Sequence, residues 1–493
     1  MGTEPDHYSA LGVNRDATPE QIRRAYHRKA RKLHPDVSEE TGATELFLNI
    51  QFAYEILSDP TKRAEYDQTL PPPPREAPLV EVNTIYSRPA LLRLNEPQLI
   101  YVLLDISAPD NSQTGPSLPL NLCLVIDRST SMQGERMDMV KATAIELVRQ
   151  IRPEDTLSLV TFSDRAEVLV SAGRNLTRSM IEEKIKQIST GGGTEIYQGL
   201  EAAYLEVRSK ANRNSVNHII LITDGRTYGD EAQCLEIANQ ASTAGIGISG
   251  LGIGAQWNDV FLDGLTSRTG GSSVYVSHSG DIHQFLWQKF SGLGQVYADR
   301  VSMDLFLNPG VELCYAFRLS PDVAALQTFS PLPLGSILLK SHLSVLLEVR
   351  VPPLVEEIYQ AGLAEGNITL DIPGASRTGL KLPIHLSRPV SASAVNQPPP
   401  TRLLQAMSRL NLYRMQERAH QVLAEGDRES ATRHLQYLAT RLFASGNQEL
   451  ARAVMAEVDQ ILREHTVSEE NKKQVKYGTR SLLMPSNVPG TIS

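Results

Sequence analysis

Residues 120–131 read LNLCLVIDRSTS, and this stretch decides the fold of the middle of the chain. Its first seven residues, Leu120–Ile126, form an almost wholly apolar run, which is typical of a β-strand buried on both faces of a sheet. Three similar runs follow, at Thr156–Thr161, His218–Thr223 and Gly245–Ile253. Helical patterns lie between them, as in Met137–Ile151 and Thr177–Ile188. Strands that alternate with helices predict a doubly wound parallel sheet with helices on both faces.

Polar side chains follow these runs where the strands are predicted to end. Asp127, Ser129 and Ser131 come directly after the first run, and Asp224 comes directly after the third. Thr194 follows three glycines and precedes a predicted helix. Because ligand sites in open parallel sheets lie outside the carboxyl ends of the strands, we expect these five side chains to converge. Two carboxylates and three hydroxyls suit a hard divalent cation, Mg²⁺ first, with Mn²⁺ and Ca²⁺ as alternatives.

Residues 119–288 resemble the von Willebrand factor A (vWA) domain with its metal-ion-dependent adhesion site. The family pattern DxSxS, then Thr, then Asp is filled at all five positions, by Asp127, Ser129, Ser131, Thr194 and Asp224. The resemblance implies that these residues bind the ion, and that the ion keeps an open position for an Asp or Glu of a protein partner. From the residues alone, Asp127 can instead be a turn or N-cap aspartate, and Thr194 can be the N-cap of the following helix.

A second informative stretch is AYHRKARKLHPD, residues 25–36. Thr18-Pro19-Glu20-Gln21 forms a capping box that predicts a helix start, and the helix runs to about Leu33, before Pro35. Its face opposite the apolar stripe is basic, with Arg23, Arg24, His27, Arg28, Arg31 and Lys32. A further helix is predicted over Ala43–Leu57, so this region should be all-α.

With YSALGV before it and FLNIQFAYEILSDPTKRAEYD after it, this region, residues 4–70, resembles the J domain of Hsp70 co-chaperones. The resemblance implies docking to an Hsp70 and stimulation of its ATP hydrolysis through His34, Pro35 and Asp36. The basic helix face would meet an acidic Hsp70 surface. A plain helical hairpin with a proline turn is the alternative.

Leu48 and Phe52 depart from the family pattern, which usually has charged residues there. Their i, i+4 spacing forms an extra apolar pair off the core stripe. The pair either packs against another part of this chain or adds a contact to the Hsp70.

The rest of the chain divides by composition. A proline run places a linker at 71–78, and alternating β patterns mark residues 79–118 and 289–390. Crossover helices are missing from the later segment, which predicts an antiparallel β-sandwich. The early strands have no partners of their own, so we expect them to pair with the later ones, with the α/β unit inserted between. Residues 398–465 predict a bundle of three amphipathic helices, and 466–493 predict a tail.

Bulk composition excludes several classes of protein. The 493 residues include 48 basic and 56 acidic ones, a net charge of −8, which argues against a nucleic-acid binder or a polybasic membrane anchor. The three cysteines form no CxxC pair, which excludes a zinc ribbon and fits a reducing compartment. Neither a signal peptide nor an apolar run of roughly 20 residues is visible. We therefore expect a soluble cytoplasmic protein.

The expected whole is a multidomain α/β protein with four parts: a J domain, a vWA domain, a β-sandwich segment and a helical bundle. The function that follows is a non-enzymatic adaptor, which brings an Hsp70 to clients or complexes held by the vWA domain. One alternative is a structural assembly protein organised by the vWA domain and the helical tail. Another is a metal-dependent hydrolase that uses Asp127, although no general base or nucleophile stands near the ligands in sequence.

Overall fold

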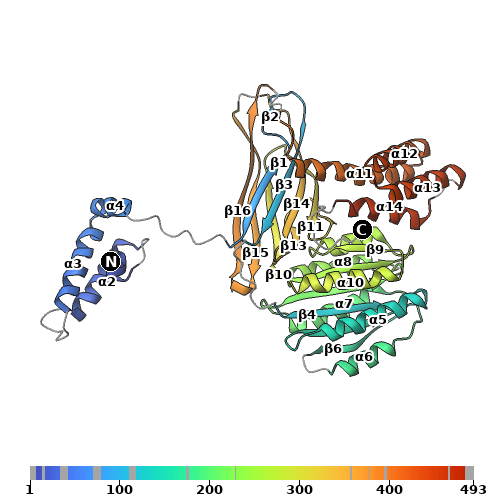
Figure 1. Cartoon of the computed structure of the whole chain (residues 1–493), viewed down its shortest axis with the longest axis horizontal. Coiled ribbons are helices and arrows are strands. Elements are labelled where there is room, and N and C mark those ends of the chain that lie inside the picture. Colours follow the sequence, from blue (N-terminus) through green and yellow to red (C-terminus); the bar gives the residue numbers. More distant parts are fainter. Residues whose placement is uncertain are drawn as a thin grey trace. The chain divides into compact units, whose positions relative to one another are not determined.

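A computed structural model describes most of the chain. The described residues are 7–13, 17–33, 43–69, 79–109, 118–173, 177–227, 229–355, 358–375, 377–393, 397–464 and 467–483. The chain divides into two compact units, Met1–Pro78 and Leu79–Ser493. The predicted fold class is confirmed, because the described residues form a small helical domain, a helix-covered α/β sheet, a β-sandwich and a C-terminal helical domain (Figure 1).

The first unit is wholly helical in its described part. Its helices are α1 (His7–Leu11), α2 (Pro19–Leu33), α3 (Ala43–Ser58) and α4 (Pro60–Thr69). The predicted capping box is present: the Thr18 N–H donates to Gln21 Oε1 at 2.8 Å, and the Gln21 N–H donates to Thr18 Oγ1 at 3.3 Å. Helices α2 and α3 pack together, with the rings of Tyr26 and Tyr54 stacked at 4.2 Å. The core is made of Tyr8, Leu11, Ala17, Ile22, Ile50, Ala53 and Leu57.

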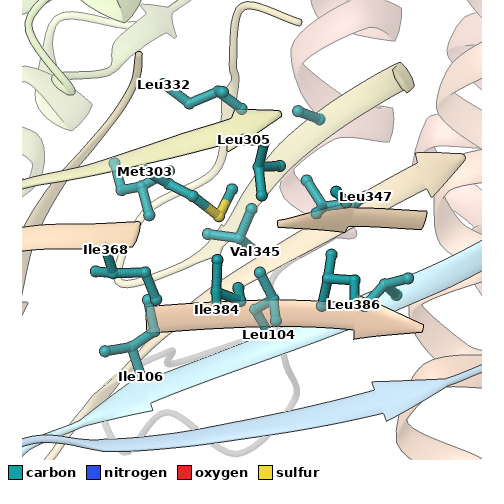
Figure 2. Close-up of a cluster of buried hydrophobic side chains, with 14 of the residues drawn as sticks. Leu104, Ile106, Met303, Leu305, Leu332, Val345, Leu347, Ile368, Ile384 and Leu386 are labelled. Atoms are coloured by element: carbon teal, nitrogen blue, oxygen red, sulfur yellow. The ribbon is translucent and has the colours of Figure 1, made fainter. Parts of the chain in front are cut away.

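A β-sandwich of two five-stranded sheets begins the second unit. One sheet has the order β1-β3-β14-β11-β12, with β1 Glu81–Tyr86, β3 Gln98–Ser107, β14 His342–Val351, β11 Glu312–Ser320 and β12 Ala324–Ala325. The other has the order β13-β10-β15-β16-β2, with β13 Leu332–Leu338, β10 Val296–Leu307, β15 Gln360–Ile372, β16 Arg377–Ser391 and β2 Leu91–Leu92. Alternate residues point inward from both sheets, and Figure 2 shows part of this core, including Leu104, Val345, Met303 and Ile384.

The sandwich is assembled from two distant parts of the chain. Strand β3 pairs antiparallel with β14 over ten residue pairs, from Ser107 opposite His342 to Gln98 opposite Val351. In Figure 1 the blue strands β1 and β3 therefore lie beside strands of yellow and orange colour. The pairing of early with late strands expected from the sequence is present, and the α/β domain is an insertion between β3 and β10.

The α/β domain has a six-stranded sheet of order β6-β5-β4-β7-β8-β9. Its strands are β4 Leu120–Asp127, β5 Thr156–Phe162, β6 Ala166–Gly173, β7 Val216–Thr223, β8 Ile246–Ile253 and β9 Ser273–Val276. Alternate residues of β4 enter two separate cores: Leu122 and Leu124 join one, and Cys123 and Val125 join the other. The first core contains α5 (Glu135–Gln150), α6 (Arg178–Lys186) and α10 (Gly280–Leu293), and the second contains α7 (Ile196–Lys210), α8 (Glu231–Thr243) and α9 (Asp259–Ser267). The sheet is therefore doubly wound.

The sheet is not wholly parallel, in contrast to the expectation from the sequence. Strand β6 pairs antiparallel with β5 at one edge. The two strands are separated by only Ser163–Arg165, which is too short for the crossover that a parallel pair needs. Most of β6 is only partly buried or exposed, so it lacks the continuous apolar run that identifies the other strands.

Four helices follow the sandwich: α11 (Thr401–Ala424), α12 (Arg428–Ala444), α13 (Gln448–Glu464) and α14 (Glu469–Ser481). The expectation of a tail at 466–493 is therefore wrong for the residues of α14, which form a helix. Several residues of this helix are buried although its sequence is polar. Lys476 Nζ lies 2.5 Å from Asp259 Oδ2 and 2.8 Å from Asp263 Oδ2, and Arg480 Nη1 lies 2.8 Å from Asp263 Oδ1. Asp259 and Asp263 of α9, in the α/β domain, therefore neutralise the charges of Lys476 and Arg480. No helix in the described part of the chain is both long and apolar enough to cross a membrane.

Candidate functional site

The predicted metal residues lie at the carboxyl edge of the six-stranded sheet. Strand β4 ends at Asp127, and Asp224 follows the end of β7, which is the parallel neighbour of β4. Both carboxylates are fully buried, at 0% exposure. Ser131 lies in a short 3-10 helix, Thr130–Met132, directly after β4, and Ser129 precedes it. Parallel pairing thus brings together side chains almost 100 positions apart in the sequence.

Hydrogen bonds join four of the five residues into one network. Ser129 Oγ and Ser131 Oγ lie 3.0 Å apart, and Ser131 Oγ donates to Asp224 Oδ1 at 2.6 Å. The Ser129 N–H donates to Asp127 Oδ1 at 2.8 Å, and Thr223 Oγ1 donates to Asp127 Oδ2 at 2.7 Å. Thr223, which the sequence analysis did not select, orients the first aspartate. Its position immediately before Asp224 is the signal that could have identified it.

The glycine loop brings in the fifth residue, Thr194. The Thr130 N–H donates to the Gly192 carbonyl at 3.1 Å, and the Gly193 N–H donates to Asp164 Oδ1 at 2.8 Å. Thr194 packs against Gly225, the residue after Asp224: a Cβ at Gly225 would lie only 2.7 Å from Thr194 Oγ1. A glycine at this position therefore allows Thr194 to lie next to the residue that follows Asp224.

The electrostatics of the two aspartates differ. Burial raises the pKa of Asp127 to about 6, against hydrogen bonds from Thr223 and Ser129, and the charge of Asp224 raises it further. Asp224 has a cation beside it, because Arg136 Nη1 of helix α5 lies 2.6 Å from its Oδ2. Arg136 is not among the residues predicted from the sequence, although it stands in the first turn of the helix that follows the DxSxS motif. Gly254 leaves room for it, since a Cβ there would lie 2.7 Å from Arg136 Nη2.

The donor set fits a hard divalent ion. It consists of oxygens only, from two buried carboxylates and three hydroxyls, which Mg²⁺ and similar ions prefer. Among the described residues, no group of three or more His, Cys, Asp or Glu side chains is arranged to hold a metal. A group of that kind would bind a softer metal or carry more negative charge, whereas the candidate site at Asp127 and Asp224 depends on hydroxyl ligands. An ion at this site would have to share the Asp224 carboxylate with Arg136, or displace the Arg136 guanidinium from it.

The J-domain residues are only partly described. His34, Pro35 and Asp36 lie outside the described residues, and so does the side chain of Lys32, although its backbone belongs to α2. The other five residues predicted for docking are all exposed, on a helix whose opposite side is buried: Arg23, Arg24, His27, Arg28 and Arg31. Leu48 and Phe52 are 59% and 57% exposed, and within the first unit the Phe52 ring lies edge-on to the His7 ring at 5.3 Å.

Three family models match parts of the chain. Residues 6–67 match the DnaJ domain, residues 121–288 match the von Willebrand factor type A domain, and residues 401–485 match the model described as "Sll0103-like, C-terminal alpha-helical domain". The chain therefore contains a DnaJ domain and a VWA domain. Arg136, Thr223 and all five predicted metal residues lie inside the VWA match.

Relatives match either the J domain or the remainder. Proteins named Chaperone protein DnaJ, from Methanosarcina thermophila and Gloeothece citriformis, are 53% and 59% identical over 68 and 63 residues. These matches cover 14% and 13% of this chain, and only 18% and 17% of the DnaJ proteins. An uncharacterized protein of Synechocystis, sll0103, is 27% identical over 385 residues, which is 76% of this chain and 90% of that protein.

Two solved structures share the fold of the larger unit. A von Willebrand factor type A protein from Catenulispora acidiphila has a TM-score of 0.64 at 15% identity, covering 82% of this chain and 97% of its own. The ArnB paralog VWA2 from Sulfolobus acidocaldarius has a TM-score of 0.52 at 16% identity, covering 82% and 99%. At these identities the likeness shows the fold alone.

Proposed function

We propose that this chain, which joins a DnaJ domain to a VWA domain, is a co-chaperone adaptor. Its J domain stimulates the ATP hydrolysis of an Hsp70 through His34, Pro35 and Asp36, and its VWA domain holds the protein on which the Hsp70 acts. The observation that carries the proposal is the match of residues 6–67 to the DnaJ domain, with relatives above 50% identity. The exposed basic face of α2 supports it, because such a face favours fast association with an acidic surface.

In this proposal the VWA domain binds its partner through a divalent cation, Mg²⁺ ahead of Mn²⁺ or Ca²⁺. Asp127, Ser129, Ser131, Thr194 and Asp224 would hold the ion. When bound, the ion supplies an open coordination position that an Asp or Glu of the partner can fill. The chain provides only two charged ligands, which balance the charge of a divalent ion but leave coordination positions that the partner can fill. Thr223 hydrogen-bonds to Asp127, and Gly225 leaves room for Thr194.

The proposed role is not enzymatic. The groups that surround the aspartates are hydroxyls, backbone amides and the guanidinium of Arg136, within the residues that the structure describes. None of these has the ordinary chemistry of a general base at neutral pH. We place the protein in the cytoplasm, and its three unpaired cysteines, Cys123, Cys234 and Cys314, fit such a reducing compartment.

The test is a pull-down with the full chain, compared in Mg²⁺ and in chelator. We expect a set of proteins to be captured in Mg²⁺, released by EDTA, and captured again when Mg²⁺ is restored. D127A should lose the same set. D138A is the matched control, because Asp138 is an exposed carboxylate on α5 whose side chain forms no hydrogen bond with the described residues of the network. Capture that is unchanged in EDTA and in D127A would overturn the metal-dependent part of the proposal.

A further inference from the structure

Helices α11 and α12 enclose a groove of about 560 Å³ in the C-terminal helical domain. Its walls carry positive and aromatic side chains, namely Tyr315, Arg414, Arg418, His434, Tyr437 and Arg441. The floor includes Leu412 and Met415, both of which also pack against the core of the helical domain. The groove thus offers an apolar floor between cationic walls.

The three arginines of the groove are held in different ways. Arg414 forms one rigid wall, because its Nη1 lies 2.5 Å from the buried carboxylate of Glu348 and its guanidinium lies 4.4 Å from the centre of the Tyr315 ring. Arg418 Nη1 donates to Gln421 Oε1 at 3.0 Å. Arg441 Nη2 donates to the Tyr437 hydroxyl at 2.6 Å. The second and third arginines thus have neutral partners, and no described carboxylate forms a salt bridge with either of them.

One carboxylate, that of Glu417, also lines the groove. Burial raises the pKa of Glu417, so its negative charge is disfavoured relative to that of an ordinary surface glutamate. Even when ionised, it is one carboxylate against the guanidinium groups of Arg418 and Arg441. Tyr437 is 52% exposed beside Arg441, which leaves a guanidinium stacked on an accessible aromatic ring. A guanidinium held against an aromatic ring loses less conformational freedom when it binds a carboxylate, with which it can form two parallel hydrogen bonds.

We propose that this groove binds an acidic peptide segment of a partner protein, with carboxylates on Arg418 and Arg441 and an apolar side chain on Leu412 and Met415. The argument is charge complementarity over an apolar floor, in a chain whose net charge of −8 makes a nucleic-acid ligand the poorer match. The site shares no residue with the predicted metal site and needs no ion. It therefore stands independently of the proposed function.

The experiment measures the fluorescence anisotropy of a short labelled peptide of Glu and Leu, mixed with the full chain in EDTA. Chelation keeps the metal site from contributing. We expect R418E/R441E to weaken binding by about tenfold or more, because two attractive charge pairs become repulsive. The matched control is R433E/R452E, which changes the net charge equally at exposed positions of α12 and α13 outside the groove. It should change the affinity less than about twofold.

Three outcomes would overturn the proposal. The wild-type chain could bind a Lys and Leu peptide as well as the acidic one, or both double variants could lose binding equally. A single-stranded oligonucleotide could displace the labelled peptide better than the unlabelled peptide does. If circular dichroism shows that R418E/R441E is unfolded, the milder variants R418Q and R441Q take its place, with R433Q as control.

Discussion

Arg136 Nη1 lies 2.6 Å from Asp224 Oδ2, so one of the two buried carboxylates at the candidate metal site already has a cation beside it. The other carboxylate, Asp127, has only hydrogen-bond donors. A divalent ion at this site would compete with the guanidinium for Asp224, because like charges repel strongly where the dielectric is low. The side chain of Arg136 is 39% exposed, so it has a path to solvent.

We therefore expect R136Q to bind Mn²⁺ or Mg²⁺ more tightly than the wild type. Gln removes the competing charge but keeps much of the side-chain volume. Solvent screening at this partly exposed arginine limits the gain to about 1 kcal/mol, which is severalfold in affinity. Isothermal titration calorimetry measures it directly. R149Q is the control, because Arg149 lies on the same helix and pairs with Glu182 at the surface. Equal or weaker binding by R136Q would show that Arg136 helps the ion.

The raised pKa of Asp127 predicts a pH dependence of stability in chelator. Between about pH 4 and pH 6, the folded chain keeps a proton on Asp127 that the unfolded chain has lost. Stability therefore falls as the pH rises through this window, and the penalty is complete above about pH 6. D127N removes the charge, so it should match the wild type near pH 4 and exceed it at pH 8 by up to about 3 kcal/mol.

Tryptophan fluorescence during denaturant unfolding is a suitable measurement for D127N. Both tryptophans of the chain, Trp257 and Trp287, lie in the α/β domain. The signal therefore reports that domain together with α14, because the ring of Trp257 lies 5.7 Å from that of Tyr477. A D127N variant that is less stable than the wild type at pH 8 would contradict the expectation. It would mean that the hydrogen bonds to the carboxylate outweigh its burial.

The J domain can be tested by substitution at the HPD motif. H34Q should abolish stimulation of Hsp70 ATP hydrolysis while leaving the circular dichroism of the chain unchanged. K62Q is a useful control, because Lys62 is a cation of the same domain that pairs with Glu55 away from the basic face of α2. A single-turnover ATPase assay with both variants is decisive: full stimulation by H34Q would refute the assignment.

The buried charges that hold α14 predict a large effect of one substitution. Although burial opposes its ionisation, Arg480 and Lys476 hold the pKa of Asp263 well below its usual range. D263N removes one carboxylate partner from each of these two buried cations. We therefore expect the free energy of unfolding, measured by tryptophan fluorescence, to fall by about 3 kcal/mol. E429Q should cost less than about 0.5 kcal/mol, because its pair with Arg433 is exposed. Similar losses in both variants would contradict this view of α14.

The inserted topology predicts how fragments behave. A fragment of residues 289–390 should not fold, because β14 loses its neighbour β3 and the sandwich core loses Leu104 and Ile106. A chain in which 79–109 is linked directly to 296–393 restores that pairing and should fold. Circular dichroism with thermal melting separates the two. A cooperative transition in the shorter fragment would show that the early strands are dispensable.

Features that depend on residues close together in the chain could be predicted from the amino-acid sequence. The apolar run of β4 followed by Asp127, Ser129 and Ser131 predicted both the parallel strands and the edge of the sheet at which these polar side chains lie. This worked because a strand buried on both faces needs a continuous apolar run, and because the carboxyl ends of parallel strands meet at one edge. The capping box at Thr18 and Gln21 likewise predicted the start of α2 from local hydrogen bonds alone.

Contacts between residues that are far apart in the sequence could not be predicted and became visible only in the folded structure. Helix α14 is too polar to be recognised as buried until Lys476 meets Asp259, which lies 217 positions earlier in the sequence. Arg136 has no visible role until parallel pairing places Asp224 beside it, 88 positions away. Strand β6 lies at the edge of the sheet, and most of its residues are partly buried or exposed. Its sequence therefore lacks the continuous apolar run that identifies the buried strands. Local patterns specify which helices and strands form. The partner that neutralises each buried charge is determined only when these elements pack together.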